Sequence, residues 1–365
     1  MAFMKELCIS RYRGIRDLKM ERLKQVNLLV GDNNCGKTSA LEAIQMLRTS
    51  GSLANVYNIA RQRDSLAMIG TNSLFSNFIC MFPKCDEDEL VISVNGICND
   101  KDISFLMKGK QERVLLDTKE LLSNKYRLRD IPDGETEADA FEGDLYLKYG
   151  HTEKKNPINI NQYSIMTGTV SSEANQFNII YMSPFAHLRG SILNRMLIND
   201  SYKQICIKAL QLFDPDIEDM LLLRSDIGDR PVEYLRHKTL GNMPVSSYGD
   251  GIKKVLALSN AIAMAAEGIL LIDEIETAIH KKYYDDIFRF VVKACKTFNV
   301  QVFITTHSIE AIDGLLATQD YELQQDTDDI CVCTIKRDSN VSYSRVLSGR
   351  EVFENREAFG FEVRL

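Results

Sequence analysis

The chain has 365 residues, of which 45% are hydrophobic and 26% are charged, and its formal net charge is −7. These values are typical of a folded α/β protein with one large domain or two smaller ones, and they argue against a globally basic nucleic-acid binder. No apolar run approaches the ~20 residues of a membrane helix, and the N-terminus lacks the apolar core of a signal sequence. We therefore expect a cytoplasmic protein with no membrane partner.

The nine cysteines are odd in number, which favours reduced thiols over a disulfide framework. The pairs Cys80/Cys85 and Cys331/Cys333 lack the usual zinc spacing and have no accompanying pair of histidines. Cys331 and Cys333 share one face of an alternating stretch, which predicts a buried strand face.

The first elements in the chain are two predicted strands, at residues 3–10 and 18–31, and a helix that follows to about residue 49. Between the second strand and this helix lies Gly31-Asp32-Asn33-Asn34-Cys35-Gly36-Lys37-Thr38, which matches G-x-x-x-x-G-K-[ST]. Strand, motif and helix together form a P-loop, whose backbone N–H groups make a concave anion site at a helix N-terminus.

Each part of this loop has a chemical role in nucleotide binding. Lys37 can reach the β- and γ-phosphates, and the Thr38 hydroxyl can bind Mg²⁺. Gly31 and Gly36 let the backbone bend around the phosphates without a Cβ in the way. The expected nucleotide contacts are Gly31, Asn33, Asn34, Gly36, Lys37, Thr38 and Ser39.

The middle of the chain has a different pattern of hydrophobic residues. After a helical stretch to about residue 82, short alternating runs between 89 and 182 predict antiparallel strands, which we assign to a β-rich insertion at 83–176. The acidic segment from Asp130 to Asp144 is expected to be a solvated loop. A buried strand at 177–183 is followed by a helical region from about 190 to 222 and a hairpin around 229–231. These last elements form a predicted helical and hairpin subdomain at 184–245.

The stretch from 245 to 310 contains the remaining chemistry. A helix at 251–266 leads into a buried strand that ends in Asp273 and Glu274. A carboxylate at that edge can hold Mg²⁺ opposite Thr38, and Glu274, which points differently, suits a catalytic base. After a helix at 281–297, the next buried strand ends at His307, which can donate a hydrogen bond to the γ-phosphate or to the attacking water. Asp273 and Glu274 can also be interpreted as caps of the following helix, and His307 as a polar residue at a strand end.

Small residues at 246–251 precede the helix that begins near 251, and Lys253 and Lys254 lie in its first turn. This pattern predicts either an ordinary helix cap or a second anion site. Because the chain has one P-loop, the second interpretation requires a dimer in which this loop covers the nucleotide of the other subunit. The last 50 or so residues predict a terminal hairpin and a short tail.

These four elements, in this order, resemble the Walker A, signature, Walker B and switch histidine of the ABC/SMC-type ATPases. The closer resemblance is to the OLD-like ATPases, the group that includes the AAA-labelled ATPases of phage-defence operons of the OLD, Gabija, Septu, PARIS and AbiL types. It rests on Arg11-Tyr12-Arg13-Gly14-Ile15, the P-loop, Ile272-Asp273-Glu274-Ile275-Glu276 with His280, and Thr305-Thr306-His307-Ser308.

The resemblance implies an α/β fold over residues 1–365: an ABC-type ATPase head with a mainly parallel core sheet, an antiparallel β subdomain and a helical insertion. Two heads would enclose ATP and Mg²⁺, with catalytic roles for Lys37, Glu274 and His307, and with Thr38 and Asp273 at the metal. Ser247, Gly249 and Gly251 would contact the opposing subunit's ATP. The position one before Asp250, where the signature motif has a serine, is Gly249 in this chain unless the register moves to Ser247. Gln62 is a weak candidate for a Q-loop residue.

Two absences narrow the expected function. Lys37 and Asp273 are 236 residues apart with no heptad run between them, so no long SMC coiled coil is expected. Too little chain follows His307 for a Toprim nuclease. The leading hypothesis is an ATPase subunit of an anti-phage defence system that controls a separately encoded effector, a nuclease, as a homodimer or higher homo-oligomer. The alternatives are a RecF-like DNA-repair ATPase, with Arg11, Arg13, Arg16 and the basic run at 125–129 as candidate nucleic-acid contacts, and an ATP-locked scaffold with slow turnover.

Overall fold

The computed structural model describes residues 4–48, 53–63, 73–84, 88–117, 135–163, 178–188, 197, 199–225, 228–321, 328–338 and 341–364. The strands are β1 Met4–Tyr12, β2 Ile15–Met20, β3 Val26–Val30, β4 Leu90–Cys98, β5 Lys101–Asp117, β6 Glu135–Tyr149, β7 Thr152–Asn161, β8 Ile179–Met182, β9 Ile217–Ser225, β10 Gly228–His237, β11 Gly241–Pro244, β12 Ile269–Ile272, β13 Gln301–Thr305, β14 Ile330–Asp338 and β15 Val341–Ser348. The α-helices are α1 Lys37–Met46, α2 Leu53–Gln62, α3 Leu74–Ile79, α5 Asp200–Leu210, α6 Asp250–Met264, α7 Tyr284–Thr297, α8 Ile309–Leu316 and α9 Gly349–Phe359.

The core is a six-stranded sheet in the order β15-β14-β3-β13-β12-β8. All neighbouring pairs from β14 to β8 are parallel, and β15 adds an antiparallel edge. The central strands β3, β12 and β13 are buried along their whole length. Parallel strands covered on both faces are continuous apolar runs, which explains why their sequences do not alternate.

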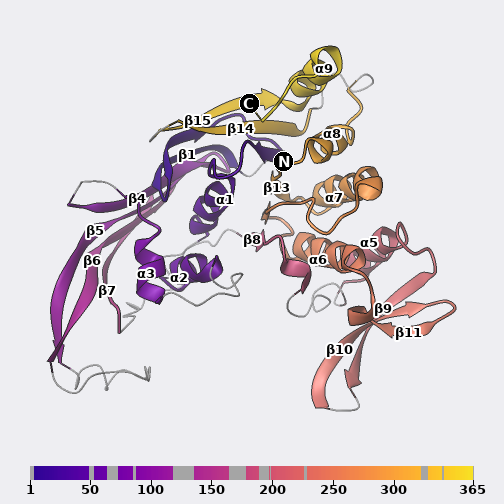
Figure 1. Ribbon diagram of the computed structural model, residues 1–365, viewed down its shortest axis with the longest axis horizontal. Helices are drawn as coiled ribbons and strands as arrows, with labels where there is room; N and C mark the ends of the chain where they lie inside the picture. Colours follow the sequence, from indigo (N-terminus) through magenta and orange to yellow (C-terminus); the bar gives the residue numbers. More distant parts are fainter. Residues whose placement is uncertain are drawn as a thin grey trace.

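Two hydrophobic clusters lie on opposite faces of this sheet. In β12, Leu270 and Ile272 belong to the cluster that packs under α5 to α8, whereas Ile269 and Leu271 belong to the cluster shared with α1 to α3. Figure 1 shows α1, α2 and α3 on one side of the core strands and α6, α7 and α8 on the other. The sheet therefore forms the middle layer, and the P-loop helix α1 is fixed between it and a second sheet.

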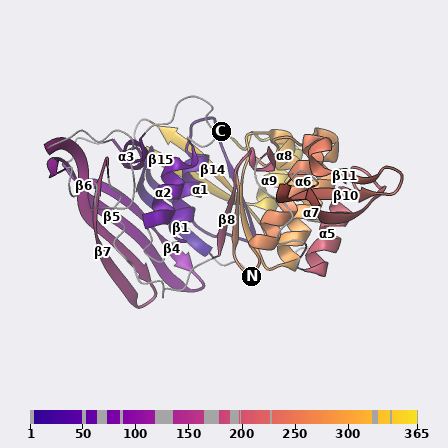
Figure 2. The ribbon, with the colours of Figure 1, turned by 90° about the horizontal axis from the view of Figure 1, so that it is seen from below.

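That second sheet is antiparallel, in the order β2-β1-β4-β5-β6-β7. Strands β4 to β7 thus extend a sheet begun by the N-terminal hairpin. A three-stranded sheet, β11-β10-β9, lies at the opposite end of the molecule. Figure 2 shows the long strands β5, β6 and β7 at one end and β10 and β11 at the other, with the core between them.

The structure corrects several of the sequence-based expectations. The predicted strand at 18–31 is two strands, β2 and β3, which belong to different sheets. The acidic segment expected to be a loop contains β6, which pairs with β5 and β7 on both sides. Glu137, Asp139, Glu142 and Asp144 are exposed or half-buried, whereas Ala138 and Phe141 are buried. The carboxylate of Asp144 lies 3.0 Å from the ammonium of Lys155.

The helical region expected to run to residue 222 stops much earlier. Helix α5 ends at Leu210, and Ile217 to Ser225 form β9, which pairs with β10 in the predicted hairpin. Pro215 disfavours the helical conformation at the preceding residue, so the apolar run that follows can pair as a strand. The expected short tail contains α9, which begins at a capping box made by Ser348 and Glu351. The basic run at 125–129 lies outside the described residues.

The strand face predicted for Cys331 and Cys333 is confirmed, because both cysteines are buried in β14 with their sulfur atoms 3.6 Å apart. Within the described part of the chain, the cysteines form no disulfide and no cluster of residues could hold a metal ion through His, Cys, Asp and Glu side chains. None of the helices described has both the length and the apolar character needed to cross a membrane.

Candidate functional site

The P-loop connects the C-terminal end of β3 to the first turn of α1. Gly31 has a φ of 141°, and a Cβ there would lie 2.3 Å from the carbonyl oxygen of Ile335, so only glycine fits this turn. Gly36, with a φ of 111°, is the residue before the helix. The ammonium of Lys37 donates to the carbonyl oxygens of Gly31 (2.8 Å) and Asp32 (2.7 Å), which closes the loop on itself.

The other predicted contacts surround this loop. Asn33 and Asn34 are exposed at its tip, and Ser39 is buried, where its hydroxyl accepts a hydrogen bond from Arg63 (2.9 Å). The loop therefore has an exposed side formed by backbone and amide groups and a buried side tied to the rest of the fold.

Asp273 is the centre of the polar network at the end of the core sheet. Its Oδ1 accepts hydrogen bonds from the hydroxyls of Thr38 (3.2 Å) and Thr305 (2.6 Å), and its Oδ2 accepts one from Tyr181 (3.0 Å). The carboxylate is 4% exposed. The contacts arise because β3, β8, β12 and β13 are parallel and end at the same edge. Thr38 and Asp273 are thus brought together as the sequence predicts.

Tyr181 belongs to this network, although the sequence pattern did not identify it. It lies on β8 opposite Leu271 of β12, and burial, reinforced by the negative charge of Asp273, raises the pKa of its hydroxyl. Gln62 lies close enough to this hydroxyl to act on its pKa in the opposite direction. The only signal in the sequence is a tyrosine at the end of an otherwise apolar strand.

Glu274 follows Asp273 but leaves the strand in a different direction. Its φ is +48°, an uncommon conformation for a non-glycine residue, and its backbone N–H donates to the Thr305 hydroxyl (2.8 Å). One carboxylate oxygen accepts from Thr277 (3.4 Å). Thr305 thus joins the two acids, since it donates to Asp273 and accepts from Glu274.

His307 lies after β13 and is held by Glu276. Oε1 of Glu276 accepts from the backbone N–H of His307 (3.1 Å) and lies 3.1 Å from its Nδ1. The Glu276 side chain is 9% exposed, whereas the imidazole is 52% exposed. A partner on Nδ1 sets which ring nitrogen faces outward. The motif at 272–276 contains Glu276, but no spacing rule indicates this partnership.

The signature-like loop lies at the N-terminus of α6. Ser247 and Gly249 are exposed, and Gly249 precedes α6 with no side-chain cap. A Cβ at Gly249 would have no atom within 4 Å, while one at Gly251 would lie 3.3 Å from the ring of Phe213. Among the hydrogen bonds of the described residues, none joins 246–251 to the P-loop. Hydrogen bonds among the described residues thus connect Thr38, Asp273 and Glu274 through Thr305, whereas Lys37 bonds within its own loop and His307 to Glu276.

The two lysines after this loop differ from the sequence-based expectation. Lys253 pairs with Asp250 (3.4 Å), but Lys254 is fully buried and its ammonium donates to the carbonyl of Pro184 (3.3 Å). Lys254 faces inward because it lies on the apolar side of α6, one turn before Leu258. Burial lowers the pKa of Lys254 to about 8, although the nearby carboxylates of Glu276, Glu274 and Asp273 act in the opposite direction.

The chain matches one family model over residues 26–313, described as "AAA domain, putative AbiEii toxin, Type IV TA system". A Helicobacter pylori protein named ATP/GTP phosphatase is 23% identical over 376 residues, which cover 96% of this chain and 97% of that protein. An uncharacterized protein of Methanocaldococcus jannaschii is 33% identical over 116 residues, or 32% of this chain and 98% of its own length.

Solved structures share the fold. An SMC head bound to the C-winged helix domain of ScpA aligns with a TM-score of 0.50 at 12% identity, over 96% of this chain and 99% of that chain. A second SMC head with an extended coiled coil, bound to the C-terminal domain of ScpA derived from Pyrococcus furiosus, aligns with a TM-score of 0.51 at 11% identity, over 99% and 100%. The family match spans most of the chain, and the α/β fold is that of SMC heads. The chain therefore belongs to this AAA family and is an ATPase.

Proposed function

We propose that the chain hydrolyses ATP in a site completed by a second copy of itself, as a homodimer or higher homo-oligomer. The observation that carries this proposal is the open space around Gly249 in the signature-like loop. The signature-like loop makes no described hydrogen bond to the P-loop, and the space around Gly249 is open. No neighbour among the described residues requires glycine at 249, so we infer that the requirement comes from a second copy.

In this proposal the P-loop binds the triphosphate. Lys37 releases the carbonyls of Gly31 and Asp32 and binds the phosphates instead, as a lysine at this position can do. The remaining contacts of the same chain are Gly31, Asn33, Asn34, Gly36, Thr38 and Ser39, and those from the second copy are Ser247, Gly249 and Gly251.

The donor set also fits Mg²⁺. The hydroxyl of Thr38 and the carboxylate of Asp273 are hard oxygen ligands 3.2 Å apart, which is the chemistry that Mg²⁺ prefers. When bound, the ion would neutralise charge on the phosphates. Glu274 acts as the base that takes a proton from the attacking water, and the exposed imidazole of His307, oriented by Glu276, donates to the γ-phosphate side.

For the biological role, we propose an anti-phage defence system in which this ATPase controls a separately encoded effector, a nuclease. The supporting facts are the resemblance of the motifs to phage-defence ATPases and the family description, which refers to the AbiEii toxin and a type IV TA system. The name of the Helicobacter pylori relative includes GTP as well as ATP, so both nucleotides are candidate substrates.

The test combines two variants of the full chain. Glu274→Gln should bind ATP normally but turn it over at least ~100-fold more slowly, because the base is lost while the fold is kept. It should also accumulate the ATP-bound dimer in light scattering. Unchanged turnover would remove Glu274 from its role, and a monomer at saturating ATP would contradict the composite site.

Gly249→Ala is the matched probe of the second copy. The added Cβ would have no described atom within 4 Å, so stability should not change, yet ATP-dependent dimerisation should weaken. Duplex DNA binding with a steep salt dependence would favour the RecF-like alternative instead. ATP-dependent assembly with very slow turnover would favour the scaffold.

A further inference from the structure

A pocket of about 650 Å³ lies beside the P-loop helix, where the turn between β1 and β2 meets the end of α3, the start of β4 and strand β14. It is notable for its charge, because five of its lining residues are basic and none of those described is acidic. The basic residues are Arg13, Arg16, Arg63, Lys84 and Arg337. The rest of the lining is largely apolar and includes Ile79, Phe82, Pro83 and Leu90.

The positive charge of this pocket is mostly uncompensated. Arg13 and Arg63 share one buried carboxylate, that of Glu42, with N–O distances of 2.8 Å. In the part of the chain that the structure describes, Arg16, Lys84 and Arg337 form no ion pair. Among the residues that the structure describes, one carboxylate therefore pairs with two of the five cations, in a chain whose net charge is −7.

The cations are also held in position before any ligand arrives. Arg16 donates to the carbonyl of Lys84 (2.9 Å), and Arg13 donates to that of Cys80 (3.3 Å). The guanidinium of Arg337 packs so closely over Gly14 that a Cβ there would lie 2.7 Å from its Nη1. Arg13 Nη2 is buried and has no hydrogen-bond partner among the described residues, so one donor group of this guanidinium remains unsatisfied.

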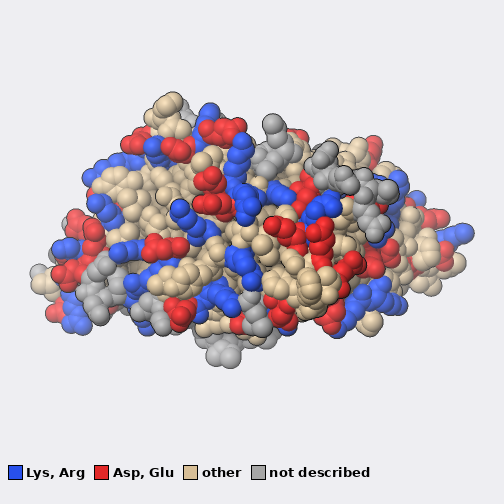
Figure 3. Space-filling view, turned by 90° about the horizontal axis from the view of Figure 1, so that it is seen from above, with Lys and Arg blue, Asp and Glu red and all other residues tan. Residues whose placement is uncertain are grey.

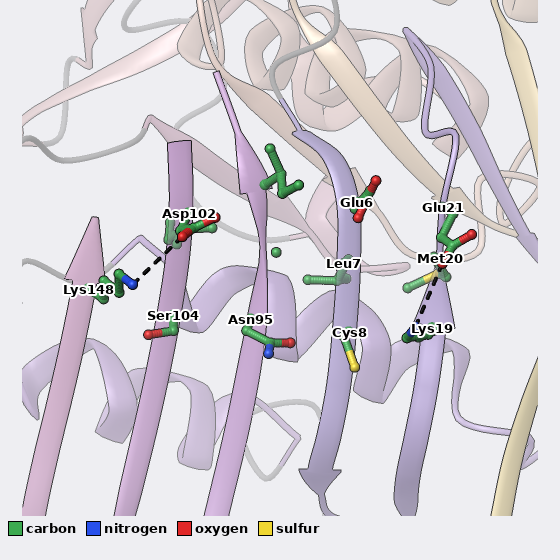
Figure 4. Close-up of a pocket in the computed structure, with 13 residues that line it drawn as sticks. Glu6, Leu7, Cys8, Lys19, Met20, Glu21, Asn95, Asp102, Ser104 and Lys148 are labelled. Atoms are coloured by element: carbon green, nitrogen blue, oxygen red, sulfur yellow. Dashed lines mark ion pairs between the residues drawn. The ribbon is translucent and has the colours of Figure 1, made fainter. Parts of the chain in front are cut away.

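A second pocket shows that this pattern is not general. The pocket in Figure 4, of about 480 Å³, lies on the sheet formed by β1, β2, β4 and β5 and contains charges of both signs. There Lys148 pairs with Asp102 (3.6 Å) and Lys19 with Glu21 (3.8 Å). Basic and acidic side chains are likewise interspersed over the face in Figure 3. The pocket beside α1 therefore differs from this second pocket in its excess of positive charge.

We propose that this pocket is a second anion site, which binds a phosphate ester with an apolar body, such as a nucleoside phosphate that is free or part of a nucleic-acid strand. Guanidinium forks match phosphate oxygens in geometry, and the apolar lining suits a sugar or base. The volume is within the range of small-ligand pockets. The pocket adjoins the P-loop helix, since its Arg63 donates to the hydroxyl of Ser39 (2.9 Å), but Lys37 is not among its lining residues. The proposal that it binds a phosphate of its own is therefore tested against the P-loop directly. The inference goes beyond the ATPase function, and its test requires no hydrolysis.

The test is equilibrium binding of AMP and of a short 5′-phosphorylated oligonucleotide to the full chain, with adenosine and the 5′-hydroxyl oligonucleotide as probes that lack the terminal phosphate. Each titration is repeated with Lys37→Ala, which removes the P-loop contribution. Arg16→Glu combined with Arg337→Glu should weaken binding at least ~tenfold. Lys19→Glu combined with Lys148→Glu, which makes the same charge change in the other pocket, should not.

The outcomes separate the sources of the phosphate. AMP binding that survives Lys37→Ala identifies a free nucleotide as the ligand. Binding of the oligonucleotide without binding of AMP identifies a nucleic-acid strand. If the 5′-hydroxyl oligonucleotide does not bind, the strand is recognised by its phosphorylated end. Arg16→Lys with Arg337→Lys should retain part of the affinity, which controls for misfolding. The proposal is overturned if neither probe binds, if binding disappears in Lys37→Ala, if the double glutamate variant binds normally, or if that variant loses ATP affinity in parallel.

Discussion

The buried Lys254 allows a quantitative prediction about stability. Its pKa falls from 10.5 to about 8 in the folded chain, and each pKa unit corresponds to about 1.4 kcal/mol. Keeping this lysine protonated in the folded state therefore costs about 3 kcal/mol. The cost applies in full at pH 7, where the lysine is charged in both the folded and the unfolded state. Methionine has a similar straight side chain and no charge.

Lys254→Met should accordingly raise the free energy of unfolding at pH 7, by up to about 3 kcal/mol. The pH dependence provides the sharper test. Between pH 8 and 10.5 the folded wild type has lost a proton that the unfolded chain still holds, so its stability rises with pH. From pH 7 to pH 9 this gain should be about 1 kcal/mol in the wild type and absent in Lys254→Met.

The assay is urea unfolding at both pH values without nucleotide or Mg²⁺, with Lys253→Met as the matched control. Lys253 is only partly buried and pairs with Asp250, so its replacement should have little effect. A parallel rise in stability for the wild type and Lys254→Met would refute the reasoning, as would a loss of stability in Lys254→Met. The same variant should hydrolyse ATP more slowly, because it lacks the positive charge near the acidic edge of the sheet.

Two further predictions concern the site. Glu276→Gln should reduce kcat roughly tenfold with little change in KM, because His307 loses the carboxylate beside its Nδ1 while nucleotide binding is kept. Steady-state kinetics measure both constants. An altered KM at constant kcat would contradict a positioning role for Glu276. Gly31→Ala should destabilise the fold by about 3 kcal/mol, since its Cβ would overlap a backbone oxygen at a positive φ. Gly249→Ala, with open space and a φ of −66°, is the control and should remain within about 0.5 kcal/mol of the wild type in urea unfolding.

The sequence alone was sufficient for the features that depend on local chemistry. The P-loop requires two glycines at fixed positions between a strand and a helix, and Gly31 and Gly36 do adopt positive φ angles. The buried strands that end at Asp273 and His307 are continuous apolar runs, a pattern that parallel strands produce by themselves. The order of strands and helices along the chain was therefore enough to assign the acids, the lysine and the histidine to one sheet edge.

Only the tertiary structure decided which side chains meet across long separations. Tyr181 and Asp273 are 92 residues apart and meet because β8 and β12 pair in parallel, a register that no local pattern specifies. The acidic segment before Asp144 becomes strand β6 because β5 and β7 satisfy its backbone on both sides, which outweighs its polar composition. Lys254 is buried because packing places α6 beside β8, and Pro184, shortly after that strand, accepts from its ammonium. Glu276 reaches His307 because the turn after β12 lies against the end of β13. Such contacts depend on the whole fold, and helical spacing or motif matching cannot supply them.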